Sequence, residues 1–229
     1  EDEEDRMACD GIIAHIAGGM RGEFNLRFGQ PSKDICFITP ELFPFLDVEQ
    51  TDPVTGQSGS LLARMSERGK IPKIMFTNTS AEYWRGDAAL IHTNLETMTD
   101  ALESEHVRRY HFAGTQHSSG TFPLLNARPL DGLRGQLPYN SVDYGPLLRA
   151  SLHNLDKWVC NVEPAPPSMH PRLSDRTAVV SDMVLSKLSR VPNIPYDWSP
   201  TRAMRLDYGP EVHLGRTTIL PAKQGEMYP

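Results

Sequence analysis

Residues 72–117 constrain the fold more than any other part of the chain, because they hold two apolar segments that are each followed by a polar loop. The segments at 72–77 and 107–113 have the length and the β-branched and aromatic residues that are typical of strands. The loop after the first segment carries Glu82, and the loop after the second carries His117. Functional sites of open α/β sheets lie at the carboxyl ends of the strands, so we expect this carboxylate and this imidazole to lie together.

Two further segments predict regular structure around this stretch. The run at 12–17 is apolar and rich in isoleucine, which is typical of a strand buried on both faces of a parallel sheet. A helix is expected from about 143 to 159, with Pro146 in its first turn. Its apolar face is expected to contain Leu148, Leu152, Leu155 and Val159. The pattern predicts an α/β fold, a mostly parallel sheet with helices on both faces.

The segments without hydrophobic periodicity indicate how the domain is organised. Residues 20–70 are irregular and rich in proline, and a long connection of this kind is usually a lid or a binding loop. The chain begins with Glu1 rather than Met and reaches an apolar strand within a few residues, and its end at Pro229 carries no stop signal. We therefore expect residues 1–229 to be the C-terminal portion of one domain, with a lid-like or binding-loop insertion at about 20–70.

Charge and composition exclude several classes of partner. The formal net charge is −6, whereas binding to a nucleic-acid backbone depends on clustered Lys and Arg, so no nucleic-acid partner is expected. No stretch approaches the roughly 20 apolar residues of a membrane helix, so no membrane span is expected. Neither the three cysteines nor the histidines at 106, 111 and 117 show metal-ligand spacing, so no metal site is predicted. The composition leaves the compartment open.

Glu82 and His117 are the residues that could carry chemistry. A carboxylate that holds one imidazole nitrogen fixes the tautomer of the ring, so that the other nitrogen can take a proton from a nucleophile. The alternative interpretation is an ordinary surface carboxylate and a turn histidine. The serine that should precede them is not obvious: 56–60 departs from G-x-S-x-G at its last position and follows a turn rather than a strand. Ser58 is therefore interpreted as a loop or cap residue.

Candidate substrate-binding residues lie near the same loops. Arg21, Asn25, Arg27 and Trp84 could form the wall of a pocket, in which an arginine would clamp a substrate carboxylate. An ion pair between an arginine and Glu23 is the alternative. The glycines at 18–19 and 114 do not form a phosphate-binding fingerprint, and no cofactor is expected.

Several segments together resemble a known family. The sequences at 18–25, 27–31, 77–84, 112–117 and 171–173 look like those of a group of α/β-hydrolase-domain proteins. The resemblance runs from about residue 10 to residue 172, and in fainter form to the end of the chain. It implies that Glu82 is the acid and His117 the base of a catalytic triad. It also implies that the nucleophilic serine lies upstream of Glu1, in a strand–turn–helix elbow.

The same resemblance implies a function. The protein would hydrolyse carboxylic esters or related acyl bonds of a small-molecule substrate through a Ser–His–Glu triad, without a cofactor. This chain alone would then be catalytically incomplete, and its partner would be the missing N-terminal portion of the same protein. The alternative is a non-catalytic binding or assembly module that retains the α/β-hydrolase pocket. A Gly-x-Ser elbow encoded upstream of Glu1 would favour the first interpretation.

Overall fold

The computed structural model describes residues 6–19, 43–127, 132–193, 200–211, 216, 218–219 and 221–229. Contacts divide the chain into two compact units, and each is described by itself. The first, called the sheet unit, consists of Glu1–Ala17, Arg64–Tyr83 and Glu103–His170. The second, called the hairpin unit, consists of Gly18–Ala63, Trp84–Leu102 and Pro171–Pro229.

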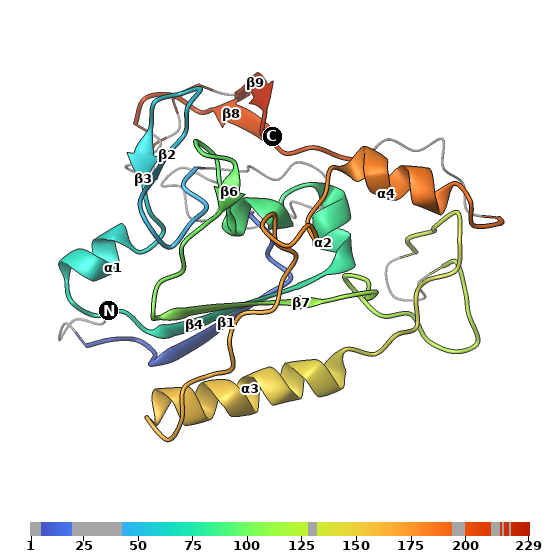
Figure 1. Ribbon diagram of the computed structural model, residues 1–229, viewed down its shortest axis with the longest axis horizontal. Coiled ribbons are helices and arrows are strands. Elements are labelled where there is room, and N and C mark those ends of the chain that lie inside the picture. The colour runs from blue at the N-terminus through green and yellow to red at the C-terminus, as the bar shows by residue number, and fades with distance from the viewer. Residues whose placement is uncertain are drawn as a thin grey trace. The chain divides into compact units, whose positions relative to one another are not determined.

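A three-stranded parallel sheet organises the sheet unit (Figure 1). Its strands are β1 (Gly11–His15), β4 (Lys73–Thr79) and β7 (Val107–Phe112), with β4 in the middle. These are the three strands expected from the apolar segments, and their parallel pairing confirms the α/β fold. Because the strands are parallel, the loops that follow β4 and β7 leave the same edge of the sheet.

Burial differs between the central strand and β1. Met75 and Thr77 of β4 are fully buried, whereas every residue of β1 is half-buried. The expected two-sided burial of this first strand is therefore wrong for the described structure. The physical reason is its position: among the described strands, only β4 pairs with β1, so β1 is an edge strand in the described part of the sheet.

Helix α3 (Gly145–Val159) covers one face of the sheet, below β1 and β4 in Figure 1. Pro146 lies in its first turn, as expected, and Leu155 and Trp158 are buried against Met75. The predicted apolar face is wrong at Leu152, which is 60% exposed, because Ser151 faces the sheet instead.

A glycine allows the helix to approach the sheet closely. A Cβ atom at Gly11 of β1 would lie 2.9 Å from Cγ2 of Val159 on α3. Any larger residue would push α3 away from the strand, and the contact between Leu155 and the sheet would open.

Three short antiparallel pairs lie in the described residues of the hairpin unit. They are β2 (Gln50–Thr51) with β3 (Ser58–Gly59), β5 (Thr93–Asn94) with β6 (Thr99–Asp100), and β8 (Met204–Asp207) with β9 (Lys223–Met227). The unit also contains η2 (Ala88–Ile91) and α4 (Ser181–Leu188). Its apolar core is formed by Phe45, Leu90, Leu95, Ala203 and Tyr228.

Two short helices lie where the units meet in the sequence. They are α1 (Ala63–Glu67) and α2 (Ser80–Arg85), and the second begins directly after β4. Among the described residues, no helix combines the length and apolar character that a membrane crossing requires.

The segment that most resembles a serine elbow is a surface hairpin. Ser58 lies in β3, exposed, and its Oγ is 2.8 Å from Oγ1 of Thr51 on β2. Gly56 turns the chain with φ of +70°. No helix follows Ser58 directly, so the hydroxyl is not presented in the way that a nucleophile elbow requires.

Candidate active site

Glu82 is a fully buried carboxylate at the start of α2. Its Oε2 atom accepts two hydrogen bonds from Thr79, one from the backbone N–H and one from the hydroxyl, each 2.7 Å long. The hydroxyl of Thr79 also accepts a hydrogen bond from the N–H of Ala81. Thr79-Ser-Ala-Glu82 is thus a capping-box sequence, in which side chain and backbone satisfy each other at a helix start. This local pattern fixes Glu82 at the end of the central strand.

His117 reaches Glu82 from the loop that follows β7. Its Nδ1 atom lies 2.7 Å from Oε1 of Glu82, while 48% of its side chain is exposed. The hydrogen bond expected between these two residues is therefore present. The two oxygens of Glu82 have separate partners, since Oε2 is held by Thr79 and Oε1 by His117.

The electrostatics of the pair define which nitrogen carries the proton. Burial raises the pKa of Glu82, but hydrogen bonds from His117 and Thr79 more than offset burial, so the pKa lies below its usual value. Glu82 is therefore an ionised acceptor, and Nδ1 of His117 carries the proton. In a neutral ring Nε2 is then an acceptor, and in the described part of the chain no side chain hydrogen-bonds to it.

Ser80 ties the His117 loop to the start of α2. Its N–H donates to the carbonyl of Thr115 over 3.2 Å, and its hydroxyl accepts a hydrogen bond from the N–H of Gly114 over 2.9 Å. The same hydroxyl lies 3.2 Å from Nε2 of His111, whose pKa is lowered by burial. Ser80 therefore connects the His117 loop to the start of α2 and to His111 of β7.

His15 is a half-buried, hydrogen-bonded histidine of β1. Its Nδ1 lies 2.8 Å from Oγ1 of Thr77, and its ring packs against Tyr144 at 5.1 Å between centroids. Burial lowers the pKa of His15, Glu82 acts in the opposite direction, and His117 lowers it further. Among the described residues, no cluster of three or more His, Cys, Asp or Glu could hold a metal ion.

The predicted pocket-wall residues are only partly described. Trp84 is half-buried and lies two residues after Glu82 on α2. Arg21, Asn25 and Arg27 lie outside the described residues, so their expected place in a pocket has no structural counterpart here.

A second buried carboxylate, in the hairpin unit, was not found by sequence reasoning. Asp87 is fully buried and accepts hydrogen bonds from the N–H of Gly19 at 2.8 Å and from Arg85 at 2.7 and 3.0 Å. Gly18 has φ of +59°, and a Cβ atom there would lie 2.1 Å from Oδ2 of Asp87. The double glycine is therefore required by a left-handed turn against this carboxylate.

Two residues that support the pair were also missed. Thr79 could have been found from the capping-box spacing that it forms with Glu82. Tyr144, whose hydroxyl donates to the backbone carbonyl of His117 over 2.9 Å, lies 27 residues further along the chain and has no local signal.

Comparison with known proteins places the chain in a family. A family model described as "Alpha/beta hydrolase domain" matches residues 1–186. Searches of curated proteins and of solved structures found no match. The family match covers most of the chain and agrees with the parallel sheet of the structure. The chain therefore belongs to the α/β-hydrolase domain family.

Proposed function

We propose that the protein hydrolyses carboxylic esters, or related acyl bonds, through a Ser–His–Glu triad in which His117 is the general base and Glu82 orients it. One observation carries the proposal: the 2.7 Å contact between Nδ1 of His117 and Oε1 of a fully buried Glu82. This contact leaves Nε2 available to a nucleophile. Membership of the α/β-hydrolase domain family supports the same reaction class.

The proposed reaction proceeds in two steps. The nucleophile is a serine outside the described residues, expected upstream of Glu1. Its hydroxyl proton passes to Nε2 of His117 while Oγ bonds to the acyl carbon, and Glu82 stabilises the imidazolium that results. His117 then returns the proton to the departing alkoxide, which leaves an acyl-enzyme. Water, activated by the same nitrogen, releases the carboxylic acid and restores the serine.

The surroundings of the pair complete the proposal. Arg21, Asn25, Arg27 and Trp84 would line the substrate pocket, with the arginines available to a polar or anionic group of the ester. The chemistry that we assign to these residues uses no cofactor. The rival function, a non-catalytic module that retains the pocket, would keep the same geometry without turnover.

Ester hydrolysis by the full-length protein tests the proposal. Wild type, His117→Ala and His153→Ala are compared on p-nitrophenyl esters of increasing chain length. His153 is a matched control, because it is an exposed histidine on α3. His117→Ala should lower kcat/KM by roughly 10³-fold or more with its thermal unfolding unchanged, whereas His153→Ala should match wild type. Wild type without activity on the whole series, or an active His117→Ala, would favour the non-catalytic module.

A further inference from the structure

The segment that precedes α3 lies against the loop that carries His117. Asn140 donates from its side chain to the carbonyl of Gly114 over 2.7 Å, and from its N–H to Oε1 of Gln116 over 2.9 Å. The carbonyl of Asn140 accepts a hydrogen bond from Gly120 over 2.7 Å. The hydroxyl of Tyr144 donates to the carbonyl of His117 over 2.9 Å. The His117 loop is therefore held from the segment before α3 as well as from β7 and the start of α2.

Of these hydrogen bonds, the one from Tyr144 acts on His117 itself. Tyr144 is the N-cap residue directly before α3, and α3 is anchored on the sheet through Leu155 and Trp158. The hydroxyl of Tyr144 is thus attached to a rigid element rather than to the loop that it holds.

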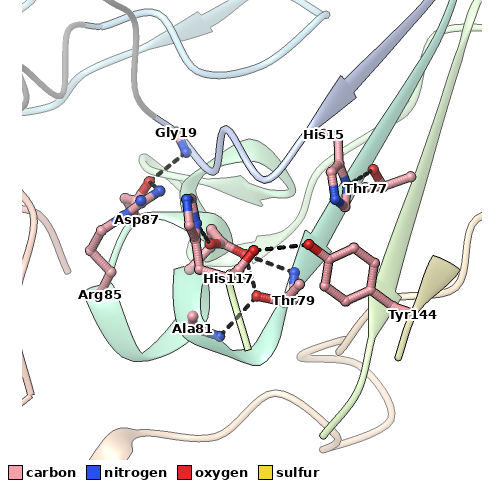
Figure 2. A network of polar contacts seen from close by, with 10 residues as sticks. His15, Gly19, Thr77, Thr79, Ala81, Arg85, Asp87, His117 and Tyr144 are labelled. Atoms are coloured by element: carbon pink, nitrogen blue, oxygen red, sulfur yellow. Dashed lines mark hydrogen bonds and ion pairs between the residues drawn. The ribbon is translucent and has the colours of Figure 1, made fainter. Parts of the chain in front are cut away.

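The ring of Tyr144 is itself fixed in place. Its centroid lies 5.1 Å from that of the His15 ring on β1 (Figure 2). It also lies 6.1 Å from the centroid of the Phe112 ring on β7. Burial and the nearby charges of Glu82 and Asp143 raise the pKa of Tyr144, so its hydroxyl keeps the proton that it donates. The ring sets where the hydroxyl lies, and the hydroxyl sets where the carbonyl of His117 lies.

His117 needs this support more than Glu82 does. Glu82 is fully buried and is held by Thr79, whereas nearly half of the His117 side chain is exposed, and within the described structure its ring makes one hydrogen bond, to Glu82. A free loop would let the imidazole turn away from Glu82, and a displacement of 1 Å at a catalytic group can cost about 10²-fold in rate.

We propose that Tyr144 is a positioning residue that holds His117 in register with Glu82 through the His117 carbonyl. The proposal deepens the function proposed above and rests on it for its kinetic consequence. Its structural consequence, the orientation and tautomer of the His117 ring, does not depend on any substrate. Tyr144 is not a catalytic residue, because its hydroxyl donates to a backbone carbonyl and not to a reacting atom.

Tyr110 supplies a matched control in the same unit. Its hydroxyl donates to the carbonyl of Pro166 over 2.7 Å, and it is half-buried in β7. Tyr110→Phe and Tyr144→Phe therefore delete the same group, a tyrosine hydroxyl bound to a backbone carbonyl. A loss that is merely structural should be shared by both variants.

The first measurement reports the His117 tautomer by nitrogen-detected NMR of the full-length protein, with His117→Gln to assign the signal. In wild type and in Tyr110→Phe the neutral ring should carry its proton on Nδ1. In Tyr144→Phe the signal should move toward a mixture of the Nδ1–H and Nε2–H forms, because the bond to Glu82 opens part of the time. An unchanged Nδ1–H signal in Tyr144→Phe would overturn the proposal.

The second measurement compares the effects of the two substitutions on kcat and on KM, with the same p-nitrophenyl esters. Tyr144→Phe should lower kcat by roughly 10- to 10²-fold and leave KM within about twofold, whereas Tyr110→Phe should keep both near wild type. Equal kcat in the two variants would overturn the positioning role while leaving the hydrolase proposal intact. If wild type hydrolyses no ester, the proposed function fails, and the NMR result alone decides the role of Tyr144.

Discussion

Thr79 donates two hydrogen bonds to the same oxygen of Glu82, and both are 2.7 Å long. The two residues are completely buried. In the folded protein, hydrogen bonds from Thr79 and His117 therefore replace those that the carboxylate would make to water. A buried charge is tolerated only when it is paired and hydrogen-bonded. The threonine hydroxyl is therefore part of what allows Glu82 to remain ionised at the end of the central strand.

Thr79→Val should expose this dependence, because it keeps the shape of the side chain and removes the hydroxyl. One of three hydrogen bonds to a buried carboxylate is lost, and we expect the free energy of unfolding to fall by about 1.5–3 kcal/mol. Thr79→Ser keeps the hydroxyl and should cost only about 1 kcal/mol for the lost methyl group. Urea unfolding of both variants checks this. Equal stability of the two would mean that the hydroxyl contributes nothing to holding Glu82.

Glu82→Gln keeps the shape of the side chain and removes its negative charge, so it tests whether the charge is needed. Thr79 donates twice to one oxygen, so the amide must place its carbonyl there and turn its NH₂ group toward His117. An NH₂ group donates, which forces Nδ1 to accept and moves the ring proton to Nε2. A ring protonated at Nε2 cannot take the serine proton.

We therefore expect Glu82→Gln to lower kcat by about 10²–10⁴-fold while the fold is retained. Stopped assays on the same esters, alongside circular dichroism, measure both properties. Glu96→Gln, an exposed residue of the hairpin unit, should leave activity unchanged. Full activity of Glu82→Gln would remove Glu82 from the triad.

The parts of the fold that sequence predicts are those with strong local signals. The three parallel strands are apolar runs, and α3 has a proline in its first turn and an apolar repeat. The pair of β8 and β9 was not predicted, because Lys223–Met227 is exposed along its length and shows no alternation. Leu152 was misplaced because several leucines could form the apolar stripe, and only the contact with the sheet selects among them.

In the candidate site, too, some features have a local sequence signal and others do not. Glu82 and His117 follow neighbouring parallel strands, so their approach could be predicted from their order along the chain. The contact of Tyr144 with His117 depends on the path of the intervening loop, which no local pattern encodes. Arg21 and the other predicted pocket residues at 25 and 27 lie outside the described structure.

The hairpin unit depends on a buried ion pair between Asp52 and Arg205. The guanidinium donates to both carboxylate oxygens at 2.8 and 2.7 Å and to the carbonyl of Met227 at 2.8 Å. It also lies 4.2 Å from the centre of the Tyr228 ring. Burial raises the pKa of Asp52, but the hydrogen bonds from Arg205 and Val54 leave it below its usual value. The pair thus joins the β2 region to the end of the chain.

Arg205→Met should destabilise the protein strongly, because it leaves the buried Asp52 without its cation. Breaking a buried pair in this way costs about 3–5 kcal/mol. Arg216→Ala is the control: its pair with Glu211 is 3.3 Å long and both side chains are 43% exposed, so its loss should cost less than about 1 kcal/mol. Thermal unfolding of both variants measures the difference in stability. Similar losses would show that the buried ion pair stabilises the protein no more than the exposed pair does.

The pKa directions predict two separate steps in the dependence of stability on pH. Burial lowers the pKa of His15 and of His111, so the unfolded chain takes up these protons at a higher pH than the folded protein does. Stability should therefore begin to fall as pH drops below about 6.5, the ordinary value for histidine. Glu82 and Asp52 have lowered pKa values despite burial, and their contribution is complete above about 4.5. It should be lost as pH falls from there through their folded pKa values.

Glu82→Gln tests the assignment of the lower step. The glutamine cannot titrate, so the variant should be less stable than wild type at pH 7 but should lose less stability as pH falls below about 4.5. The step that begins below about pH 6.5 should persist, because the histidines that cause it remain. Urea midpoints measured across this range for wild type and variant give both slopes. Equal slopes below pH 4.5 would mean that the folded structure does not favour the ionised form of Glu82, and the electrostatic basis for its role in orienting His117 would be lost.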